Sequence, residues 1–323
     1  MEFAPKKRLQ LYSGRSNPAL AIEVAAHLGV ELGSPNLVDF ANGEIRCTFG
    51  ESIRGTDLFI LQTHHNTVNE SIMEQLIMID AAKRASAKRI TAVIPFYGYA
   101  RQDRKAAGRE PITAKLIADM LTTAGADRVV ALDLHSGQIQ GFFDIPVDHL
   151  TALPVLVDHL RYTVGPDCVI VSPDSGRVKV AERMAKHLDA DVASIYKRRS
   201  TSRVDSVEAL DIMGDVDGRY CVIVDDMIAT GGTICAAAEI LKSKGATGVM
   251  AAVTHGELSG NAIEKIQNSV FDKVLITNSI ALPPEKQIDK IVVLSIAPLL
   301  ADAISAVFED ASVSEIFGGE NLS

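Results

Sequence analysis

Short apolar runs alternate with stretches of helical periodicity along almost the whole chain. Each run is only a few residues long and lacks regular polar alternation, as is typical of strands buried on both faces of a parallel sheet. Strands and helices in alternation predict an α/β fold, in which mainly parallel sheets are flanked by helices. The predicted strands are Leu58–Leu61, Ile90–Ile94, Val129–Leu132, Val169–Val171, Val222–Val224, Val249–Val253, Val274–Ile276 and Ile291–Leu294, and the predicted helices include Asn69–Lys83, Ile112–Thr123 and Thr233–Lys244.

The two halves of the chain resemble each other. Five short segments recur in the same order, at offsets of 162, 163, 159, 145 and 144 residues. This suggests an internal duplication of one α/β unit, with domains at residues 1–150 and 151–323, although any two α/β halves share some similarity. The matched segments begin at Ser13 and Ser175, Gly55 and Gly218, Ser86 and Gly245, Asp127 and Asp272, and Pro154 and Pro298.

The fall in offset from 159 to 145 places 14 residues in the first half that the second half lacks. The best candidate for this insertion is Pro95–Pro111, which is rich in arginine and glycine. A long basic loop in an acidic protein has the character of a mobile phosphate-binding flap, and Phe96, Tyr97 and Tyr99 suit stacking on a base. A solvated charged loop is the alternative.

Composition narrows the class of protein further. The chain has 323 residues, 47% of them hydrophobic, which is enough for two packed domains. A formal net charge of -9 gives no support to general nucleic-acid binding. The sequence shows neither a signal-peptide core nor a membrane-length apolar stretch, and its four cysteines form no CxxC pair. We expect a soluble cytoplasmic protein with free thiols and with no nucleic-acid or membrane partner.

Val222–Thr233, with the sequence VIVDDMIATGGT, carries the strongest chemical signal. An apolar strand ends in Asp225 and Asp226, a turn of small residues follows, and then a helix begins. Ligands bind α/β sheets at the carboxyl ends of strands, glycines let backbone N–H groups close on a phosphate, and a helix N-terminus favours its charge. The two acids can accept hydrogen bonds from ribose hydroxyls, while Thr230 and Thr233 add donors. The segment predicts a sugar-phosphate site, with a capped helix turn as the alternative.

This segment resembles the phosphoribosyl-diphosphate-binding signature of type I phosphoribosyltransferases. Further motifs are similar, in order and spacing, to those of ribose-phosphate pyrophosphokinases, from about Leu9 to the C-terminal SVSEIF. These motifs are FANGE (Phe40–Glu44), RQDRK (Arg101–Lys105), DLHSGQIQGFFDIPVDHL (Asp133–Leu150), SPDSGR (Ser172–Arg177) and YKRR (Tyr196–Arg199).

The resemblance implies two duplicated type I phosphoribosyltransferase-like domains and an enzyme of nucleotide biosynthesis. Such an enzyme, a ribose-phosphate diphosphokinase, transfers the diphosphate of Mg-ATP to the C1 hydroxyl of ribose 5-phosphate and gives 5-phosphoribosyl 1-diphosphate and AMP. The chain has no GxxxxGK[ST] motif, so ATP would be held without a Walker loop. The resemblance also implies Mg²⁺ as cofactor, dimers assembled into a homohexamer, and ADP and phosphate as regulators.

The resemblance assigns roles to individual residues. Catalysis falls to Lys197, Arg199 and His135, and the metal to His135 and Asp174. A hydrogen-bonding role for His135 stays equally open, because Mg²⁺ prefers oxygen ligands. ATP is expected at Asn42, Gly43, Glu44, Arg101 and Gln102, with Arg104 and Lys105 in the flap 95–111; ribose 5-phosphate is expected at Arg199 and, in the loop 225–233, at Asp225, Asp226, Ala229, Thr230, Gly231, Gly232 and Thr233.

Three residues depart from the family motifs. Arg177 adds a charge to SPDSGR, Tyr196 stands where aspartate is frequent, and Ala229 stands where the phosphate loop usually has aspartate. Two other functions stay open: a phosphoribosyltransferase that consumes the diphosphate, and a weakly active homologue that binds active synthetase subunits. Release of AMP from ATP and ribose 5-phosphate distinguishes the synthetase from both.

Overall fold

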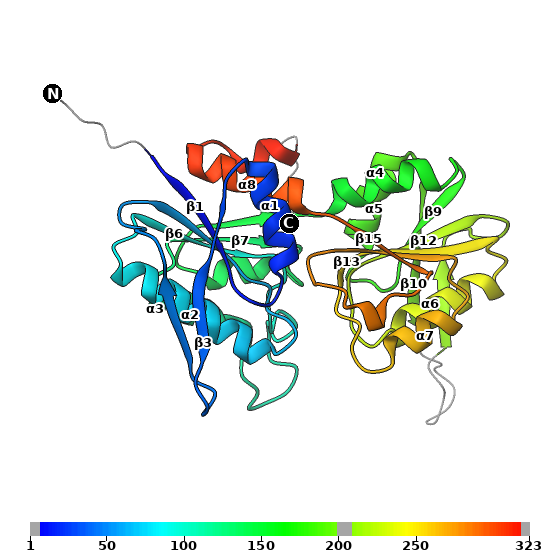
Figure 1. Ribbon diagram of the computed structural model, residues 1–323. Helices are drawn as coiled ribbons and strands as arrows, with labels where there is room; N and C mark the ends of the chain where they lie inside the picture. The colour runs from blue at the N-terminus through cyan, green and yellow to red at the C-terminus, as the bar shows by residue number, and fades with distance from the viewer. Residues whose placement is uncertain (1–6, 199–208, 318–323) are drawn as a thin grey trace. The chain divides into compact units, whose positions relative to one another are not determined.

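A computed structural model describes residues 7–198 and 209–317 and divides them into two compact units (Figure 1). Unit 1 holds the residues up to Thr151, Ser279–Ala281, and those from Ile296 onward, and unit 2 holds Ala152–Asn278 and Leu282–Ser295. The change of unit after Thr151 lies beside the boundary expected at residue 150. The return of the last segment to unit 1 departs from the expected single cut, because helix α8 (Ala297–Glu309) packs against α1 (Pro18–Leu28).

Unit 1 contains a six-stranded sheet in the order β2-β1-β5-β6-β7-β8, in which every pair of neighbours is parallel. Helices α1 and α8 lie together on one face, and α2 and α3 lie on the other (Figure 1). Strands β3 and β4 form a separate antiparallel hairpin. The elements of unit 1 are β1 (Leu9–Ser13), α1, β2 (Leu32–Gly33), β3 (Pro35–Asp39), β4 (Ile45–Phe49), β5 (Asp57–Leu61), α2 (Val68–Arg84), β6 (Arg89–Ile94), α3 (Thr113–Ala124), β7 (Arg128–Leu132), η1 (Gly137–Phe142), β8 (Val147–Leu150), α8 and η3 (Val313–Phe317).

Unit 2 contains a seven-stranded sheet in the order β11-β10-β9-β12-β13-β14-β15. All neighbours are parallel except β10 and β11. Helices α4 and α5 lie on one face, and α6 and α7 on the other (Figure 1). The elements of unit 2 are α4 (Leu153–Thr163), β9 (Cys168–Ser172), α5 (Val178–Leu188), β10 (Asp191–Arg198), β11 (Ala209–Met213), β12 (Tyr220–Ile228), α6 (Gly232–Ser243), β13 (Gly248–Gly256), α7 (Ala262–Asn268), β14 (Lys273–Thr277), η2 (Pro284–Lys286) and β15 (Ile291–Leu294).

The continuous apolar runs are explained by burial of both faces of each sheet. In β9, Val169 and Val171 join the core beneath α6 and α7, whereas Cys168 and Ile170 join the core beneath α4 and α5. Successive side chains of a strand point to opposite faces, so a strand covered on both sides needs apolar residues at every position. All eight predicted strands and three predicted helices are confirmed within a few residues of their expected ends.

The two sheets share one strand order, which supports the internal duplication. Strands β2-β1-β5-β6-β7-β8 correspond to β10-β9-β12-β13-β14-β15. The predicted insertion lies where expected, because 95–112 separates β6 from α3 whereas only 257–261 separates β13 from α7. The last helix of each repeat crosses to the other unit: α4 follows β8 but belongs to unit 2, and α8 follows β15 but belongs to unit 1. We call this reciprocal crossing the helix exchange.

The end of α8 is tied to unit 1 by charge pairs at Asp310. The Asp310 carboxylate accepts from Lys7, and its Oδ1 accepts from Arg89 Nη1 at 2.6 Å. Arg89 also makes a forked pair with the buried carboxylate of Asp57, with both N–O distances 2.8 Å. These contacts connect the C-terminal end of α8 to β6 and, through it, to β5.

Replacing Asp310 with asparagine is expected to lower the melting temperature at pH 7, because both charge pairs are lost while the side-chain shape is kept. The hydrogen bond from Lys7, followed by that from Arg89, lowers the pKa of Asp310 to about 2 from its ordinary value of 3.8. A carboxyl whose pKa is lowered by folding stabilises the fold above its unfolded pKa, and this contribution disappears as pH falls through the folded pKa. The difference between variant and parent should be complete at pH 7 and shrink below pH 4.

Circular dichroism melts at several pH values check this, with Asp302→Asn as a control at an exposed position of the same helix. Equal melting temperatures of Asp310→Asn and the parent at pH 7 would show that the pairs do not stabilise the attachment of α8.

The four cysteines are all free thiols, Cys168 and Cys221 buried and the other two half-buried. Within the described ranges, no helix combines the length and the apolar character that crossing a membrane requires.

Candidate functional site

The acid pair Asp225–Asp226 lies within the last part of β12 rather than just after it. The sequence predicted that the strand would end before the acids, but β12 continues to Ile228, and Asp225 pairs with Val253 of β13. On its other side, β9 accompanies β12 only as far as Ile223. The acids therefore occupy the carboxyl end of a central strand, where one neighbouring strand has already ended.

Arg177 pairs with both acids of the proposed ribose site. Its Nη2 lies 2.6 Å from Oδ2 of Asp226, and its Nε lies 3.2 Å from Oδ1 of Asp225. The side chains are 15% exposed for Arg177, 22% for Asp225 and 6% for Asp226. The additional charge that Arg177 brings to the SPDSGR motif thus lies directly against the acid pair.

Burial, followed by the charge of Asp226, raises the pKa of Asp225 well above its ordinary value, while Arg177 acts in the opposite direction. The backbone N–H of Asp226 donates to Asp225 Oδ1 at 2.8 Å. Two carboxylates this close cannot both ionise easily unless positive charge lies near them. Arg177 supplies part of that charge, and a bound cation would supply more, whereas sugar hydroxyls would stabilise the carboxylates by donating hydrogen bonds.

The loop Ala229–Thr233 connects β12 to α6 as the sequence predicted. Gly231 is the N-cap of α6 and has φ 73°, in the left-handed region that glycine adopts at little cost. Thr230, Gly232 and Thr233 are exposed. The first backbone N–H groups of a helix have no intrahelical partner, so this loop can bind a phosphate group. The backbone carbonyl of Ala229 accepts from Ser259 N at 2.9 Å, which holds the loop from the β13–α7 side.

Lys265 is a cation beside this loop that the sequence did not reveal. From α7, its Nζ donates to the carbonyl oxygen of Thr230 at 3.1 Å. It also lies 3.8 Å from the position that a Cβ on Gly232 would take. It belongs to none of the motifs, and only the packing of α7 against α6 brings it to the loop.

In unit 1, the motif FANGE forms the exposed turn of the β3–β4 hairpin. Phe40 N donates to the carbonyl oxygen of Glu44 at 2.8 Å, and Gly43 N donates to that of Phe40 at 2.8 Å. The side-chain oxygen of Asn42 accepts from Glu44 N at 3.2 Å. Asn42, Gly43 and Glu44 are all exposed, so the turn is available to a ligand.

The basic insertion is anchored by its aromatic residues. Phe96 and Tyr97 are buried, and the Tyr97 hydroxyl donates to the carbonyl oxygen of Ala114 at 2.9 Å. The expectation that these two rings stack on a base is therefore wrong, because they pack in the core at the start of the loop. Tyr99 is half-buried, and its hydroxyl donates to Asn69. The charged and amide side chains of the predicted ATP flap remain exposed, namely Arg101, Gln102, Arg104 and Lys105.

His135 lies in a tight loop after β7, half-buried. The loop begins at Asp133, whose φ of 36° is positive. The loop is supported by His149 of β8, whose Nε2 accepts from Leu134 N at 2.9 Å. His149 belongs to the motif Asp133–Leu150, but its support of the loop was not visible from the sequence because β7 and β8 meet only in the sheet.

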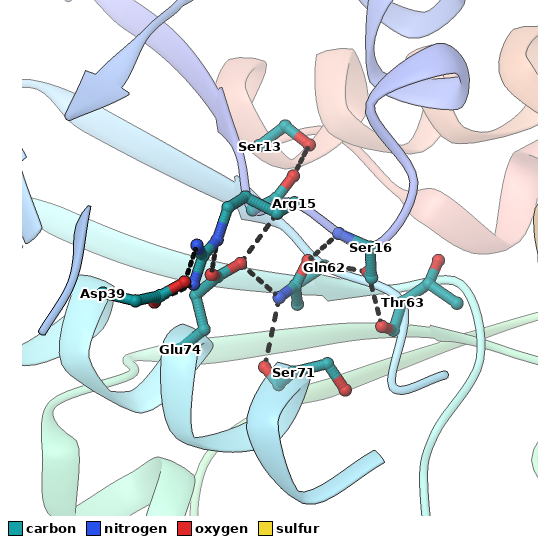
Figure 2. Close-up of polar contacts among 9 residues, drawn as sticks. Ser13, Arg15, Ser16, Asp39, Gln62, Thr63, Ser71 and Glu74 are labelled. Carbon is teal, nitrogen blue, oxygen red and sulfur yellow. Dashed lines mark hydrogen bonds and ion pairs between the residues drawn. The ribbon is translucent and has the colours of Figure 1, made fainter. Parts of the chain in front are cut away.

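Unit 1 has no acid pair at the point equivalent to Asp225–Asp226. The repeat offset of 163 residues places Gln62 and Thr63 there, directly after β5. Gln62 is buried, and its amide bonds Ser16, Ser71 and Glu74 (Figure 2). An internal polar network thus occupies the position that the acid pair holds in unit 2.

The predicted catalytic residues Lys197 and Arg199 lie at and just beyond the end of the described part of β10. Arg199 lies outside the described residues, and Lys197 is placed only by its backbone in β10, where it pairs with Leu210 of β11.

Asp174, a predicted metal residue, is exposed, and its Oδ1 accepts from Gly176 N at 2.8 Å. Among residues 7–198 and 209–317, no group of three or more His, Cys, Asp or Glu side chains is arranged to hold a metal ion.

The similarity to known proteins extends over nearly the whole chain. Residues 9–125 match the family model of the N-terminal domain of ribose phosphate pyrophosphokinase, and residues 201–318 match that of the phosphoribosyl synthetase-associated domain. A ribose-phosphate pyrophosphokinase of Streptomyces avermitilis is 53% identical over 97% of both chains, and one of Bacillus cereus is 53% identical over 96% of this chain and 97% of its own. The crystal structure of phosphoribosylpyrophosphate synthetase from Mycobacterium smegmatis superposes with a TM-score of 0.89 at 50% identity, over 94% of this chain and 100% of that one.

Proposed function

The chain belongs to the ribose-phosphate pyrophosphokinase family, and from this membership we propose how its two units divide the reaction. The enzyme transfers the diphosphate of ATP to the C1 hydroxyl of ribose 5-phosphate and gives 5-phosphoribosyl 1-diphosphate and AMP for nucleotide biosynthesis. One observation carries this function: the likeness spans 97% of the chain and of its relative, so it includes both repeats.

Unit 2 is the proposed ribose 5-phosphate domain, with its loop at 225–233. Asp225 and Asp226 accept hydrogen bonds from the ribose hydroxyls, and the turn before α6 binds the 5-phosphate. Support comes from the exposed loop at a helix N-terminus, the glycine at φ 73°, and the acids at a strand end. The phosphate would contact Ala229, Thr230, Gly231, Gly232 and Thr233, and Arg199 would add a charge-assisted bond.

Unit 1 is the proposed ATP domain, with its flap at 95–111. Asn42, Gly43 and Glu44 recognise the adenosine end of ATP from the hairpin turn, together with Arg101 and Gln102. Support comes from the exposure of all five residues and from the hydrogen-bonded turn that presents the first three. Arg104 and Lys105 are the cations of the flap, and they approach the phosphates when it closes.

The proposed chemistry is a single displacement at phosphorus. The C1 hydroxyl oxygen attacks the β-phosphorus of ATP, the bond from that phosphorus to the oxygen shared with the α-phosphate breaks, AMP leaves, and the hydroxyl proton is released to solvent. Lys197 and Arg199 stabilise the charge on the transferring diphosphate, as positioned cations do in phosphoryl transfer. His135 donates a hydrogen bond to the triphosphate from the loop that His149 supports.

Mg²⁺ is the proposed cofactor, and it would neutralise charge on the phosphate oxygens. The donor set of this chain suits an ion that keeps several waters: Asp174 offers an exposed carboxylate, and a carboxylate oxygen is a better ligand than the imidazole of His135. We further propose a cytoplasmic enzyme assembled as dimers within a homohexamer, with ADP and phosphate as regulators. The family membership supports the proposed cofactor, compartment, assembly and regulators.

The function is tested by incubating the purified protein with Mg-ATP and ribose 5-phosphate and measuring AMP. Equal amounts of AMP and 5-phosphoribosyl 1-diphosphate are expected. A phosphoribosyltransferase would release no AMP from these substrates, and it would release diphosphate only when given 5-phosphoribosyl 1-diphosphate and a base. A binding homologue would release no AMP while melting cooperatively, and either result would overturn the proposed function.

A further inference from the structure

Arg15 joins two acidic side chains from different elements of unit 1 (Figure 2). Its Nη1 and Nη2 donate to the two carboxylate oxygens of Asp39 at 2.7 and 2.8 Å. Its Nε donates to the carboxylate of Glu74. Forked pairs of this kind fix orientation as well as distance, so Arg15 holds Asp39 in one geometry relative to α2.

Arg15 connects Asp39 to Glu74, and the Glu74 carboxylate is buried and accepts hydrogen bonds from Arg15 and Gln62. The Glu74 side chain is only 3% exposed, and it accepts from Arg15 N at 2.7 Å and from Gln62 Nε2 at 2.8 Å in addition to Arg15 Nε. Gln62 in turn bonds Ser16 and Ser71, which places the β1–α1 loop, β5 and α2 in one network (Figure 2). A buried carboxylate needs such partners, and removing one is costly, so this end is a firm anchor.

The Asp39 end lies beside the hairpin turn Phe40–Glu44. Asp39 is the last residue of β3 and the cross-strand partner of Ile45, the first residue of β4. The turn is closed by its own hydrogen bonds, so it moves as one piece with Asp39. An isolated two-stranded hairpin is marginally stable, and this one packs on the core through Leu37 and Cys47 at its middle and Phe49 at its base. The contact between Arg15 and Asp39 is therefore well placed to fix the hairpin turn Phe40–Glu44.

An exposed salt bridge often contributes little to the stability of a fold, and the Asp39 side chain is 46% exposed. Two observations distinguish this one. The guanidinium that pairs with both carboxylate oxygens of Asp39 also donates to the buried carboxylate of Glu74, and its hydrogen bond to Asp39 lowers the pKa of that carboxyl. The equivalent arginine of the second SGR segment, Arg177, also pairs with two acids, and those acids belong to the proposed ribose site.

We propose that Arg15 is a positioning residue for ATP, which fixes the hairpin turn Phe40–Glu44 by connecting Asp39 to the buried carboxylate of Glu74. This inference rests on the proposed function, in which that turn recognises ATP. Arg15 contacts no substrate in this role, and its effect reaches ATP through the geometry of Asn42, Gly43 and Glu44.

The test is a steady-state analysis of Asp39→Asn and Arg15→Lys with both substrates varied. Either change removes the forked charge pair, and the KM for ATP is expected to rise about tenfold. The KM for ribose 5-phosphate and kcat should stay within about twofold of the parent values, because unit 2 is untouched. Hydrogen exchange at the Phe40 and Glu44 amides should become faster in Asp39→Asn. Asp80→Asn, which breaks an exposed pair with Arg84 on α2, is the matched control and should change none of these quantities.

Equal increases in KM for both substrates, or an unchanged KM for ATP in Asp39→Asn, would overturn the inference. Asn42→Ala and Glu44→Ala separate it from the proposed function. If they raise the KM for ATP while Asp39→Asn does not, the turn binds ATP but Arg15 does not position it. If neither raises the KM for ATP, the ATP assignment of the turn is wrong and the inference fails with it.

Discussion

Replacing Lys197 with alanine is expected to lower kcat by roughly 100- to 1,000-fold, the range seen when one preorganised donor to a developing charge is lost. In the proposed mechanism the diphosphate carries its greatest charge on the reacting oxygens while the C1 hydroxyl attacks. Lys197 interacts most strongly at that stage, so kcat should fall much more than either KM rises. A spectrophotometric assay of AMP release with both substrates saturating measures the effect.

Lys186→Ala provides the matched control. This exposed lysine lies in the last turn of α5, just before β10 begins, whereas Lys197 lies near the end of β10, and the loss of Lys186 should leave kcat unchanged. A Lys197→Ala enzyme that melts like the parent and keeps more than about a tenth of its kcat would show that another group supplies the charge.

Replacing Asp225 with asparagine is expected to raise the KM for ribose 5-phosphate by about 10- to 100-fold, with little change in the KM for ATP. Hydroxyl donors favour the ionised form of Asp225 in the complex, and a hydrogen bond to a charged group contributes roughly 1.5–3 kcal/mol, whereas the asparagine amide can accept through only one oxygen. Asp167→Asn, at an exposed position before β9, is the control and should leave both constants unchanged.

Stability separates this effect on binding from a folding defect. Because burial and Asp226 raise the pKa of Asp225, the carboxyl stabilises the fold at low pH and loses this contribution as pH rises through its folded pKa. Asparagine is neutral at every pH, so the variant does not lose stability in this way as the pH rises. The melting temperature of Asp225→Asn relative to the parent should therefore increase from pH 6 to pH 9, while the KM for ribose 5-phosphate stays high. A variant that loses stability increasingly with pH would contradict the proposed state of the acid pair.

The sequence predicted those parts of the fold that depend on local pattern. Buried strands such as Val249–Val253 were visible because both faces are covered and every position is apolar. The β3–β4 hairpin was missed because its residues are exposed or half-buried, and no apolar run marks it. The end of β12 was misplaced for a related reason: Asp225 and Asp226 look like a strand terminus, yet their backbone continues to pair with β13.

Contacts between distant segments could not be predicted from the sequence. The motifs identified the phosphate loop, but nothing in them showed that Lys265 would reach the carbonyl of Thr230. The motif showed that Arg177 adds a charge. It did not show that Arg177 pairs with both acids, because this pairing depends on the distance between the ends of β9 and β12. Phe96 and Tyr97 were misinterpreted because aromatic residues suit both a core and a base-binding surface, and only burial distinguishes the two.

The helix exchange means that neither repeat can be excised as a continuous piece. A fragment ending at Thr151 would keep α1 but lose α8, and the buried face of α1, including Leu20 and Val24, would meet water. The complementary fragment would keep β15 but carry α8 without its packing partner. Such reciprocal crossing has the topology of a domain-swapped dimer, here within one continuous chain. A first unit that keeps its own α8 could be engineered by attaching residues 296–317 directly after β8 in place of α4, although it would still lack Ser279–Ala281, whose Ser279 carbonyl accepts from Asn17 and Thr63.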